Sequence, residues 1–292
     1  MSISGRIDLH MHSTVSDGTD SPQELLSRVS GAGISLFSVT DHDTVKGCLE
    51  VIDLLAPGSP SFITGVEVSC RDEEGRYHIL GYGYDPDAVP INDLAAKGHS
   101  VRFEKLRLRI DRLKEMFGIV FPKDEVDSLY ALENPGKPHI GELLVRHGYS
   151  SSVSNAISDY INKLGVRSMH FAPQTAIEMI NASGGIPVLA HPFYGDGDQM
   201  IYDDEMEQRL ARLRDMGLKG VEAFYSGFAP RQIRSMLDMA ERYGLYVTAG
   251  SDYHGSRKLV QLGDTNLGDV SEAPDRLKKF LSDVADRTFS VV

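Results

Sequence analysis

Cysteines are scarce in this sequence, and long apolar stretches are missing. Only Cys48 and Cys70 occur among 292 residues, and they form no CxxC motif. We therefore expect no disulfide framework and take a reducing cytoplasm as the expected compartment. No run approaches the roughly 18 apolar residues that a membrane helix needs. The first ten residues also lack the basic start and apolar stretch of a signal peptide.

Positive charge is also in short supply. The chain has 30 lysines and arginines against 42 aspartates and glutamates, which gives a formal net charge of −12. We expect no membrane partner and no general binding of duplex nucleic acid, because so acidic a surface repels phosphate backbones. An anionic substrate would need a locally positive site, which bound metal ions can supply. The content of 41% hydrophobic and 25% charged residues is typical of a globular protein.

Short apolar runs alternate with helical patterns over much of the chain. We expect strands within 7–11, 34–43, 61–70, 76–83, 184–192, 218–226 and 245–254. Helical patterns lie between most of them, starting with 22–33 and 45–56. This β-α rhythm predicts an α/β fold with a mostly parallel sheet of about seven strands and helices outside.

The rhythm changes between 92 and 170. This stretch opens with one long amphipathic helix and continues with shorter helical patterns near 138–147 and 153–163, without a clear strand. We therefore expect a catalytic part formed by 1–91 and 171–292. The insertion, 92–170, would form a substrate lid or a subdomain.

Metal-binding residue types follow most of the predicted strands. They are His10, His12, Asp41, His42, Glu67, His191, Asp252 and His254. In α/β folds the carboxyl ends of the strands form the working face. His78 is an exception because it begins its strand pattern, and it would point into the site only if that strand is offset or differs in register.

Each motif also has a simpler explanation. The HxH pair places two imidazoles on one side of a strand, Asp43 is a candidate helix cap, and the Ser-Asp-Gly stretch at 16–18 is typical of a turn. Glu67 could pair with an arginine, and His191 could be a core histidine before a rigid turn. All of these together at one end of one sheet are harder to explain this way, so we expect a shared site.

Taken in order, the motifs DLHMHSTVSDG, VTDHDT, GVEVS, RYHILGYG, LAHP and GSDYH resemble those of the PHP (polymerase and histidinol phosphatase) family of metal-dependent phosphoesterases. The resemblance covers nearly all of the chain. It is strongest to the bacterial nucleoside 3′,5′-bisphosphate phosphatase subgroup, which carries a helical insertion at the same place. It implies the PHP fold, a distorted (β/α)7 barrel, here with the helical insertion.

The resemblance also implies a site for two to three divalent ions, with Mn, Zn or Fe as candidates. The implied ligands are His10, His12, Glu67 and Asp252 for a first ion, Glu67, His78 and His191 for a second, and Asp17, His42 and His254 for a third. Many family members have histidine where Asp17 stands, whereas this subgroup has aspartate. Mixed nitrogen and oxygen ligands without cysteine also suit Zn, Mn or Fe better than a site for Mg or Ca alone.

These features predict a phosphoesterase that hydrolyses phosphate monoesters by means of a metal-bridging hydroxide. The resemblance makes the 3′-phosphate of nucleoside 3′,5′-bisphosphates (pAp-like) the expected target, with related nucleotides or short oligonucleotides as further candidates. Asp41 and His254 are candidates for the general acid. Asp41 could instead orient a ligand histidine.

Substrate contacts are expected from the insertion. Lys137 and His139 lie at a predicted helix start, a common anion site, although a capped helix with exposed side chains explains them equally well. Lys163 or Arg167 could add a second basic group. Arg102 and Arg107 could face the substrate, but a solvated helix face with i,i+4 ion pairs is the stronger explanation.

Several other functions remain open. Within the same family they are histidinol phosphate phosphatase and 5′-3′ exoribonuclease. The amidohydrolase superfamily also begins with HxH, but it usually has a bridging lysine where this chain offers Glu67. The non-enzyme alternatives are a regulatory PHP module and a protein that binds phosphate without hydrolysing it.

Overall fold

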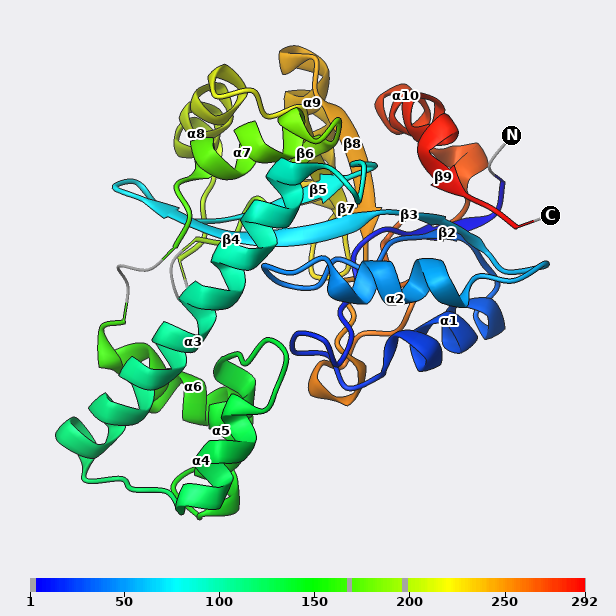
Figure 1. The fold of residues 1–292 in the computed structure, drawn as a ribbon. Coiled ribbons are helices and arrows are strands. Elements are labelled where there is room, and N and C mark those ends of the chain that lie inside the picture. Colours follow the sequence, from blue (N-terminus) through cyan, green and yellow to red (C-terminus); the bar gives the residue numbers. More distant parts are fainter. Residues whose placement is uncertain (1–3, 167–169, 196–198, 292) are drawn as a thin grey trace.

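A computed structural model describes residues 4–166, 170–195 and 199–291 (Figure 1). The strands are β1 (Arg6–Asp8), β2 (Ile34–Phe37), β3 (Ser61–Ile63), β4 (Gly65–Asp72), β5 (Gly75–Tyr82), β6 (Ile186–Leu189), β7 (Gly220–Tyr225), β8 (Tyr246–Gly250) and β9 (Thr288–Phe289). The α-helices are α1 (Pro22–Gly31), α2 (Lys46–Leu54), α3 (Val89–Phe117), α4 (Lys123–Tyr130), α5 (Lys137–Arg146), α6 (Val153–Asp159), α7 (Pro173–Ala182), α8 (Asp203–Asp215), α9 (Pro230–Tyr243) and α10 (Asp275–Val284). The expected mixed α/β fold is confirmed.

The strands form two sheets, with the orders β1-β2-β3-β9 and β4-β5-β6-β7-β8. Backbone hydrogen bonds link the sheets where the chain runs on past β1 and β2. The Leu9 N–H donates to Ala249 O at 3.0 Å, and the Glu67 N–H donates to Asp41 O at 3.3 Å. The expected distorted (β/α)7 barrel is not confirmed, because the named strands of the described residues remain two separate sheets.

The expectation of a mostly parallel sheet is wrong for β5. This strand is antiparallel to both β4 and β6, whereas β6, β7 and β8 are parallel to one another. Only Glu73 and Glu74 separate β4 from β5, a link too short for the crossover that parallel pairing requires. A strand that runs antiparallel to its neighbours begins at the edge of the sheet where those neighbours end. This explains why His78 lies early in its strand and still reaches the site.

Helices cover the strands on two sides. In Figure 1, α1 and α2 lie below the strands, and α7, α8 and α9 lie above them. The α1 helix begins at a capping box, in which the Ser21 side chain accepts from the Glu24 N–H and the Glu24 carboxylate accepts from the Ser21 N–H. Its buried Leu25 and Val29 are four residues apart and join the main apolar core.

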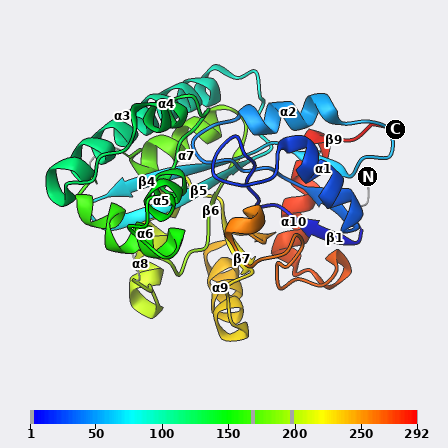
Figure 2. The same cartoon turned by 90° about the horizontal axis from the view of Figure 1, so that it is seen from below.

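The stretch between β5 and α7 carries a second apolar cluster. The long helix α3 begins among main-core residues, with Ile91 and Leu94 buried there. Its far half instead supplies Leu106 and Leu113 to the second cluster, which α4, α5 and α6 complete. Figures 1 and 2 show these three shorter helices gathered beside the far half of α3. Whether this part acts as a substrate lid stays a prediction.

Several helices and strands differ from those predicted from the sequence. The helices α4 and α10 and the short strand β9 were not expected, and the stretch at 61–70 divides at Thr64 into β3 and β4. The long helix also begins at Val89, ahead of the expected boundary at 92. No helix of the described residues is long and apolar enough to cross a membrane. The cytoplasmic location stays a prediction.

Candidate metal centre

The Glu67 carboxylate lies at the centre of a cluster of imidazoles. It is 1% exposed and projects from β4. The imidazole nitrogens within 3.4 Å of its two oxygens belong to His10, His12, His42, His78 and His191. Convergence of so many nitrogens on one carboxylate is the arrangement expected of a bridging ligand.

Asp252 approaches the same cluster from the segment after β8. Its Oδ1 lies 3.3 Å from His12 Nε2 and 3.6 Å from His10 Nε2. Its Oδ2 accepts hydrogen bonds from the Tyr225 hydroxyl at 2.9 Å and from Lys258 Nζ at 2.6 Å. One oxygen is thus held by neighbours while the other faces the two histidines.

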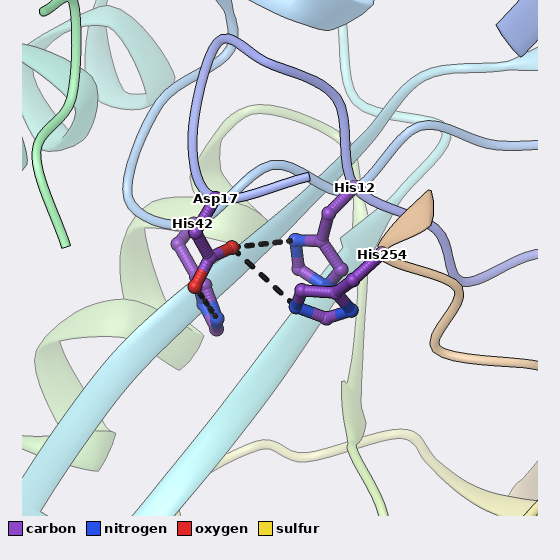
Figure 3. Close-up of side chains that lie close together, drawn as sticks. All are labelled: His12, Asp17, His42 and His254. Atoms are coloured by element: carbon purple, nitrogen blue, oxygen red, sulfur yellow. Dashed lines mark ion pairs between the residues drawn. The ribbon is translucent and has the colours of Figure 1, made fainter. Parts of the chain in front are cut away.

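A second group of ligand types surrounds Asp17, as Figure 3 shows. His254 Nε2 lies 3.4 Å from Asp17 Oδ1, and His12 Nδ1 lies 3.8 Å from the same oxygen. His42 Nε2 is 3.9 Å from Asp17 Oδ2. His12 therefore offers one nitrogen to the Asp17 group and the other to Glu67, a double placement that the sequence analysis did not foresee.

His78 and His191 meet at the other Glu67 oxygen. His78 Nδ1 lies 2.7 Å and His191 Nε2 lies 3.1 Å from Oε1. The Nε2 atom of His78 contacts Arg76 Nη2 at 2.6 Å. Ligand atoms of His42, Glu67 and His78 also lie within 4.8 Å of one another, so His42 lies close to this set as well as to Asp17.

Unsatisfied polar atoms indicate that these residues fit metal ions. Six buried side-chain atoms of the predicted ligands make no hydrogen bond to another described residue: His10 Nε2, both nitrogens of His12, His42 Nδ1, Glu67 Oε2 and His191 Nδ1. A buried polar atom without a partner costs roughly 1–3 kcal/mol, and native proteins pair such atoms with protein groups, water or ions. Divalent cations would pair with the carboxylate oxygen and with the imidazole nitrogens that carry a free lone pair. The number and identity of the ions stay predictions.

The electrostatics of the cluster keep its central carboxylate charged. Burial alone would raise the pKa of Glu67, but His78, His42 and His10 hold that pKa well below its ordinary value. Asp17 behaves in the same way, because His42 and His254 outweigh its burial and lower its pKa. Both groups are therefore ready to bind cations at neutral pH.

The cluster opens into a cavity of about 1060 Å³. Beyond the ligand types, this cavity has a wall of basic side chains from the β4–β5 hairpin, from α3 and from the start of α5. They are Arg71, Arg76, Arg102, Lys105, Arg109 and Lys137. Arg71 and Arg76 are paired across the hairpin on the same face as Ser69 and His78, so that face runs from the cluster into the basic wall.

Two of these basic side chains are buried. Lys105 is 6% exposed and Arg109 is 7% exposed, and among the described residues neither has a carboxylate within ion-pair distance. Burial, helped by Arg102 and Arg109 and opposed by Asp43, lowers the pKa of Lys105 to about 7. Burial and the cations around it likewise lower the pKa of Lys137 to about 7. Such a concentration of positive charge favours an anionic ligand.

Two of the residues predicted to bind substrate line this cavity. Arg102 does so while its guanidinium pairs with Asp43 at 2.7 Å. Lys137 lines it and donates to Asn162 Oδ1 at 2.6 Å. His139 lies two residues further along α5 but outside the cavity wall, where its Nδ1 accepts from the Gly136 N–H at 2.9 Å.

The other predicted contacts lie elsewhere. Arg107 does not line the cavity but forms surface ion pairs with Glu104 and Asp111 at 2.6 and 3.1 Å, so the alternative of a solvated helix face describes it. Lys163 is exposed and also outside the cavity wall. Arg167 lies outside the described residues.

The two candidates for the general acid differ in position. His254 lines the cavity, with Nδ1 2.8 Å from Asp252 O. Asp41 is 1% exposed and does not line it. Its carboxylate instead accepts from the Ser13 and Ser16 hydroxyls at 2.6 Å, which holds the loop before Asp17. This geometry does not favour Asp41 as a proton donor to substrate.

Sequence reasoning missed several cavity residues. Lys105 and Arg109 belong to the basic run of α3, where the spacing of Arg102, Lys105 and Arg109 by three and four residues marks one helix face. That pattern could have distinguished them from Arg107.

Glu222, a fully buried carboxylate in the apolar strand β7, was also missed, and its isolation in that strand was the available signal.

The sequence matches the model of one protein family over most of its length. The PHP domain model matches residues 8–216, so the chain belongs to the PHP domain family. The expected resemblance is thereby confirmed.

Named relatives in this family act on different phosphate esters. A 3′,5′-nucleoside bisphosphate phosphatase of Chromobacterium violaceum is 29% identical over 92% of this chain and 92% of its own. A phosphoribosyl 1,2-cyclic phosphate 1,2-diphosphodiesterase of Eggerthella lenta is 30% identical over 85% of this chain and 94% of its own. A 5′-3′ exoribonuclease of Haemophilus influenzae is 29% identical over 88% and 93%.

Solved structures agree with the family. A protein of Chromobacterium violaceum described as an amidohydrolase, with bound sulfate and no metal, has a TM-score of 0.82 at 25% identity and covers 97% of each chain. A candidate metal-dependent phosphoesterase of Bifidobacterium adolescentis has a TM-score of 0.78 at 27% identity, over 94% of this chain and 95% of its own. Together with the relatives, these matches support a hydrolase that acts on phosphoric ester bonds, the enzyme class expected from the sequence.

Proposed function

We propose that this protein is a metal-dependent phosphatase that removes the 3′-phosphate from nucleoside 3′,5′-bisphosphates. The observation that carries the proposal is the placement of two unlike sites in one cavity. One end holds the imidazoles and carboxylates around Glu67 and Asp17. The wall beyond holds buried Lys105 and Arg109, neither of which has a carboxylate within ion-pair distance in the part of the chain that the structure describes.

The cluster would hold two or three divalent ions. His10, His12, Glu67 and Asp252 would bind a first ion, Glu67, His78 and His191 a second, and Asp17, His42 and His254 a third. When bound, such ions supply Lewis acidity, make water a nucleophile at neutral pH and neutralise charge on a phosphoryl group. His254 lines the cavity and Asp41 does not, so His254 is the better placed proton donor to the leaving oxygen in a form with two ions, where its nitrogen is not a ligand.

The basic wall supports a substrate with a second phosphate. Lys105, Arg109 and Lys137 come from two different helices and face the same cavity. A phosphate monoester with no other anion would leave these charges uncompensated, whereas a bisphosphate would neutralise both ends of the cavity. Charge-assisted hydrogen bonds from such groups are roughly twice as strong as neutral ones.

This wall disfavours histidinol phosphate, the alternative from the same family. Its end remote from the phosphate carries an amine and an imidazole, which would face like charges on Lys105 and Arg109. A short oligonucleotide remains a second candidate substrate. The cavity of about 1060 Å³ exceeds the typical upper size of roughly 1000 Å³ for a small-molecule site, and the basic wall continues to Arg71.

A phosphate-release screen tests the proposal. The purified protein would be analysed for metal content and assayed with adenosine 3′,5′-bisphosphate, adenosine 3′-phosphate, adenosine 5′-phosphate, histidinol phosphate and a short oligoribonucleotide. We expect fastest release from the bisphosphate, with adenosine 5′-phosphate as product and loss of activity in chelator. A preference for histidinol phosphate would contradict the substrate assignment. Stoichiometric phosphate binding without turnover would favour the non-enzyme alternative.

A further inference from the structure

A fully buried carboxylate joins two of the ligand-bearing segments. Glu222 lies in β7 and is 0% exposed. Its Oε1 accepts from His10 Nδ1 at 2.9 Å, and its Oε2 accepts from the backbone N–H of His191 at 2.8 Å. His10 follows β1 and His191 follows β6, so one side chain holds two distant parts of the chain.

The contact with His10 selects the nitrogen that faces the cluster. An imidazole that donates its Nδ1–H to a carboxylate keeps a free lone pair on Nε2. This Nε2 atom lies 3.4 Å from Glu67 Oε2 and 3.6 Å from Asp252 Oδ1, and it makes no hydrogen bond to another described residue. Glu222 therefore presents the lone pair of His10 to the place where carboxylates converge.

The contact with His191 restrains an unusual backbone. His191 has a φ of 28°, in a region that non-glycine residues rarely occupy. Such a conformation persists only where the surroundings hold it. The bond from its N–H to Glu222 is one such restraint, and it lies next to the imidazole that approaches Glu67.

The neighbouring strand packs closely against this pair. A Cβ atom on Gly250 of β8 would lie 2.2 Å from His10 Cβ and 2.5 Å from Glu222 Oε1. Glycine thus allows the backbone of β8 to pass directly against the His10–Glu222 pair. The backbone of β8 therefore packs tightly against the imidazole on this side.

We propose that Glu222 is a positioning residue that fixes His10 and His191 for metal binding. This role rests on the proposed function, because it takes both histidines to be ligands. Carboxylate partners of this kind fix the orientation of a ligand histidine and raise its basicity. The carboxylate itself does not line the cavity and need not touch substrate.

The variant Glu222→Gln tests the inference because it keeps the shape and changes the hydrogen bonding. An amide has one oxygen. If it accepts from the His191 N–H, its NH2 group faces His10 Nδ1 and forces the proton onto Nε2. If it turns to accept from His10, it no longer accepts from His191. We expect the first equivalent of Mn²⁺ or Zn²⁺ to bind roughly 10- to 100-fold more weakly, as measured by competition with a chromophoric chelator.

The thermal midpoint of the metal-free protein separates positioning from a purely structural role. We expect Glu222→Gln to melt close to the wild type without metal, and Glu222→Asp, which keeps the charge with a shorter reach, to bind metal with intermediate affinity. Exposed Glu241→Gln, whose native partner is Arg276, is the matched control and should bind metal normally. If Glu222→Gln does not fold, the metal affinity of Glu222→Asp decides.

The outcomes distinguish this inference from the proposed function. Wild-type affinity for Mn²⁺ and Zn²⁺ in both Glu222 variants would overturn the positioning role and leave the phosphatase proposal intact. A wild-type protein that binds neither ion would overturn the proposed function, and the positioning role with it. A fall in affinity that only mirrors loss of the metal-free fold would also contradict the inference.

Discussion

Replacement of Lys105 by methionine should weaken turnover of a nucleoside 3′,5′-bisphosphate and spare that of a 3′-monophosphate. Lys105 projects from the middle of α3 into the cavity, is 6% exposed, and has no carboxylate at ion-pair distance among the described residues. Methionine has a similar length and no charge. The substitution would therefore remove one proposed contact to the second phosphate and leave the proposed metal ligands unchanged.

The size of the effect follows from the kind of contact. A hydrogen bond to a charged group contributes about 1.5–3 kcal/mol, and each 1.4 kcal/mol is about tenfold in an equilibrium constant. We therefore expect kcat/KM for adenosine 3′,5′-bisphosphate to fall roughly 10- to 100-fold. For adenosine 3′-phosphate we expect a change below about threefold, because that substrate has no second phosphate. Phosphate release under initial-rate conditions measures both.

The stability of Lys105→Met provides an independent check, because the substitution should keep or raise stability while it lowers turnover of the bisphosphate. The folded protein holds the pKa of Lys105 at about 7, below that of an unfolded lysine, so the unfolded chain binds more protons above that pH. The charged form thus costs folding free energy at pH 7 and below, and this cost disappears as the pH rises through the unfolded value. Lys105→Met should melt at the same temperature as the wild type or higher near pH 6.5. Exposed Lys114→Met on the same helix is the control.

Two results would refute this reasoning. An equal loss for both substrates would mean that Lys105 acts on the metal centre or the fold and not on a second phosphate. Unchanged kinetics with both substrates would mean that the buried cations do not meet substrate at all.

Three further perturbations should have measurable effects. Glu67→Gln should lose bound metal, as measured by elemental analysis, and should lower kcat by roughly 10³-fold, because the bridging charge is removed. Activity within tenfold of the wild type would contradict the proposed metal site. KM for the bisphosphate should rise as the pH increases above 7, because the pKa values of Lys105 and Lys137 are about 7 and their neutral forms bind phosphate weakly. A KM that stays constant from pH 6 to 9 would contradict a role of these two lysines in binding the substrate. Arg107→Ala should change kcat/KM less than about twofold and the free energy of unfolding by less than about 1 kcal/mol, because its ion pairs are exposed; a large kinetic effect would return Arg107 to the substrate site.

The convergence of ligand types was largely predictable because most of them follow strand ends. His10, His191 and Asp252 are far apart in the chain, yet each follows a strand, and the rule that parallel strands share a carboxyl edge brings them together. His78 was harder to place, because the sequence does not state that β5 runs antiparallel. The short link after Asp72 fixes that direction, and its two residues could have been weighed as a hairpin signal.

The substrate end of the cavity was less predictable. A basic helix shows which residues share a face, but the face that meets the cavity depends on how α3 packs against the rest of the molecule. Arg102 and Arg107 are equally basic, and only the fold turns one inward and the other to solvent. Glu222 was hidden for a different reason, because its partners lie on segments that only tertiary pairing brings near it.

The unbroken length of α3, from Val89 to Phe117, has a consequence for the size of substrate that this protein would prefer. Its start is packed into the main core, and at Gly98 an added Cβ would lie 2.4 Å from Asp43 O, next to the proposed ligand His42. The helix then rises about 1.5 Å per residue, so each later turn carries its side chains about 5.4 Å further away. Position along the helix thus sets the distance from the proposed metal site. Substitutions on successive turns could lengthen or shorten the preferred substrate while the hydrolytic chemistry stays the same.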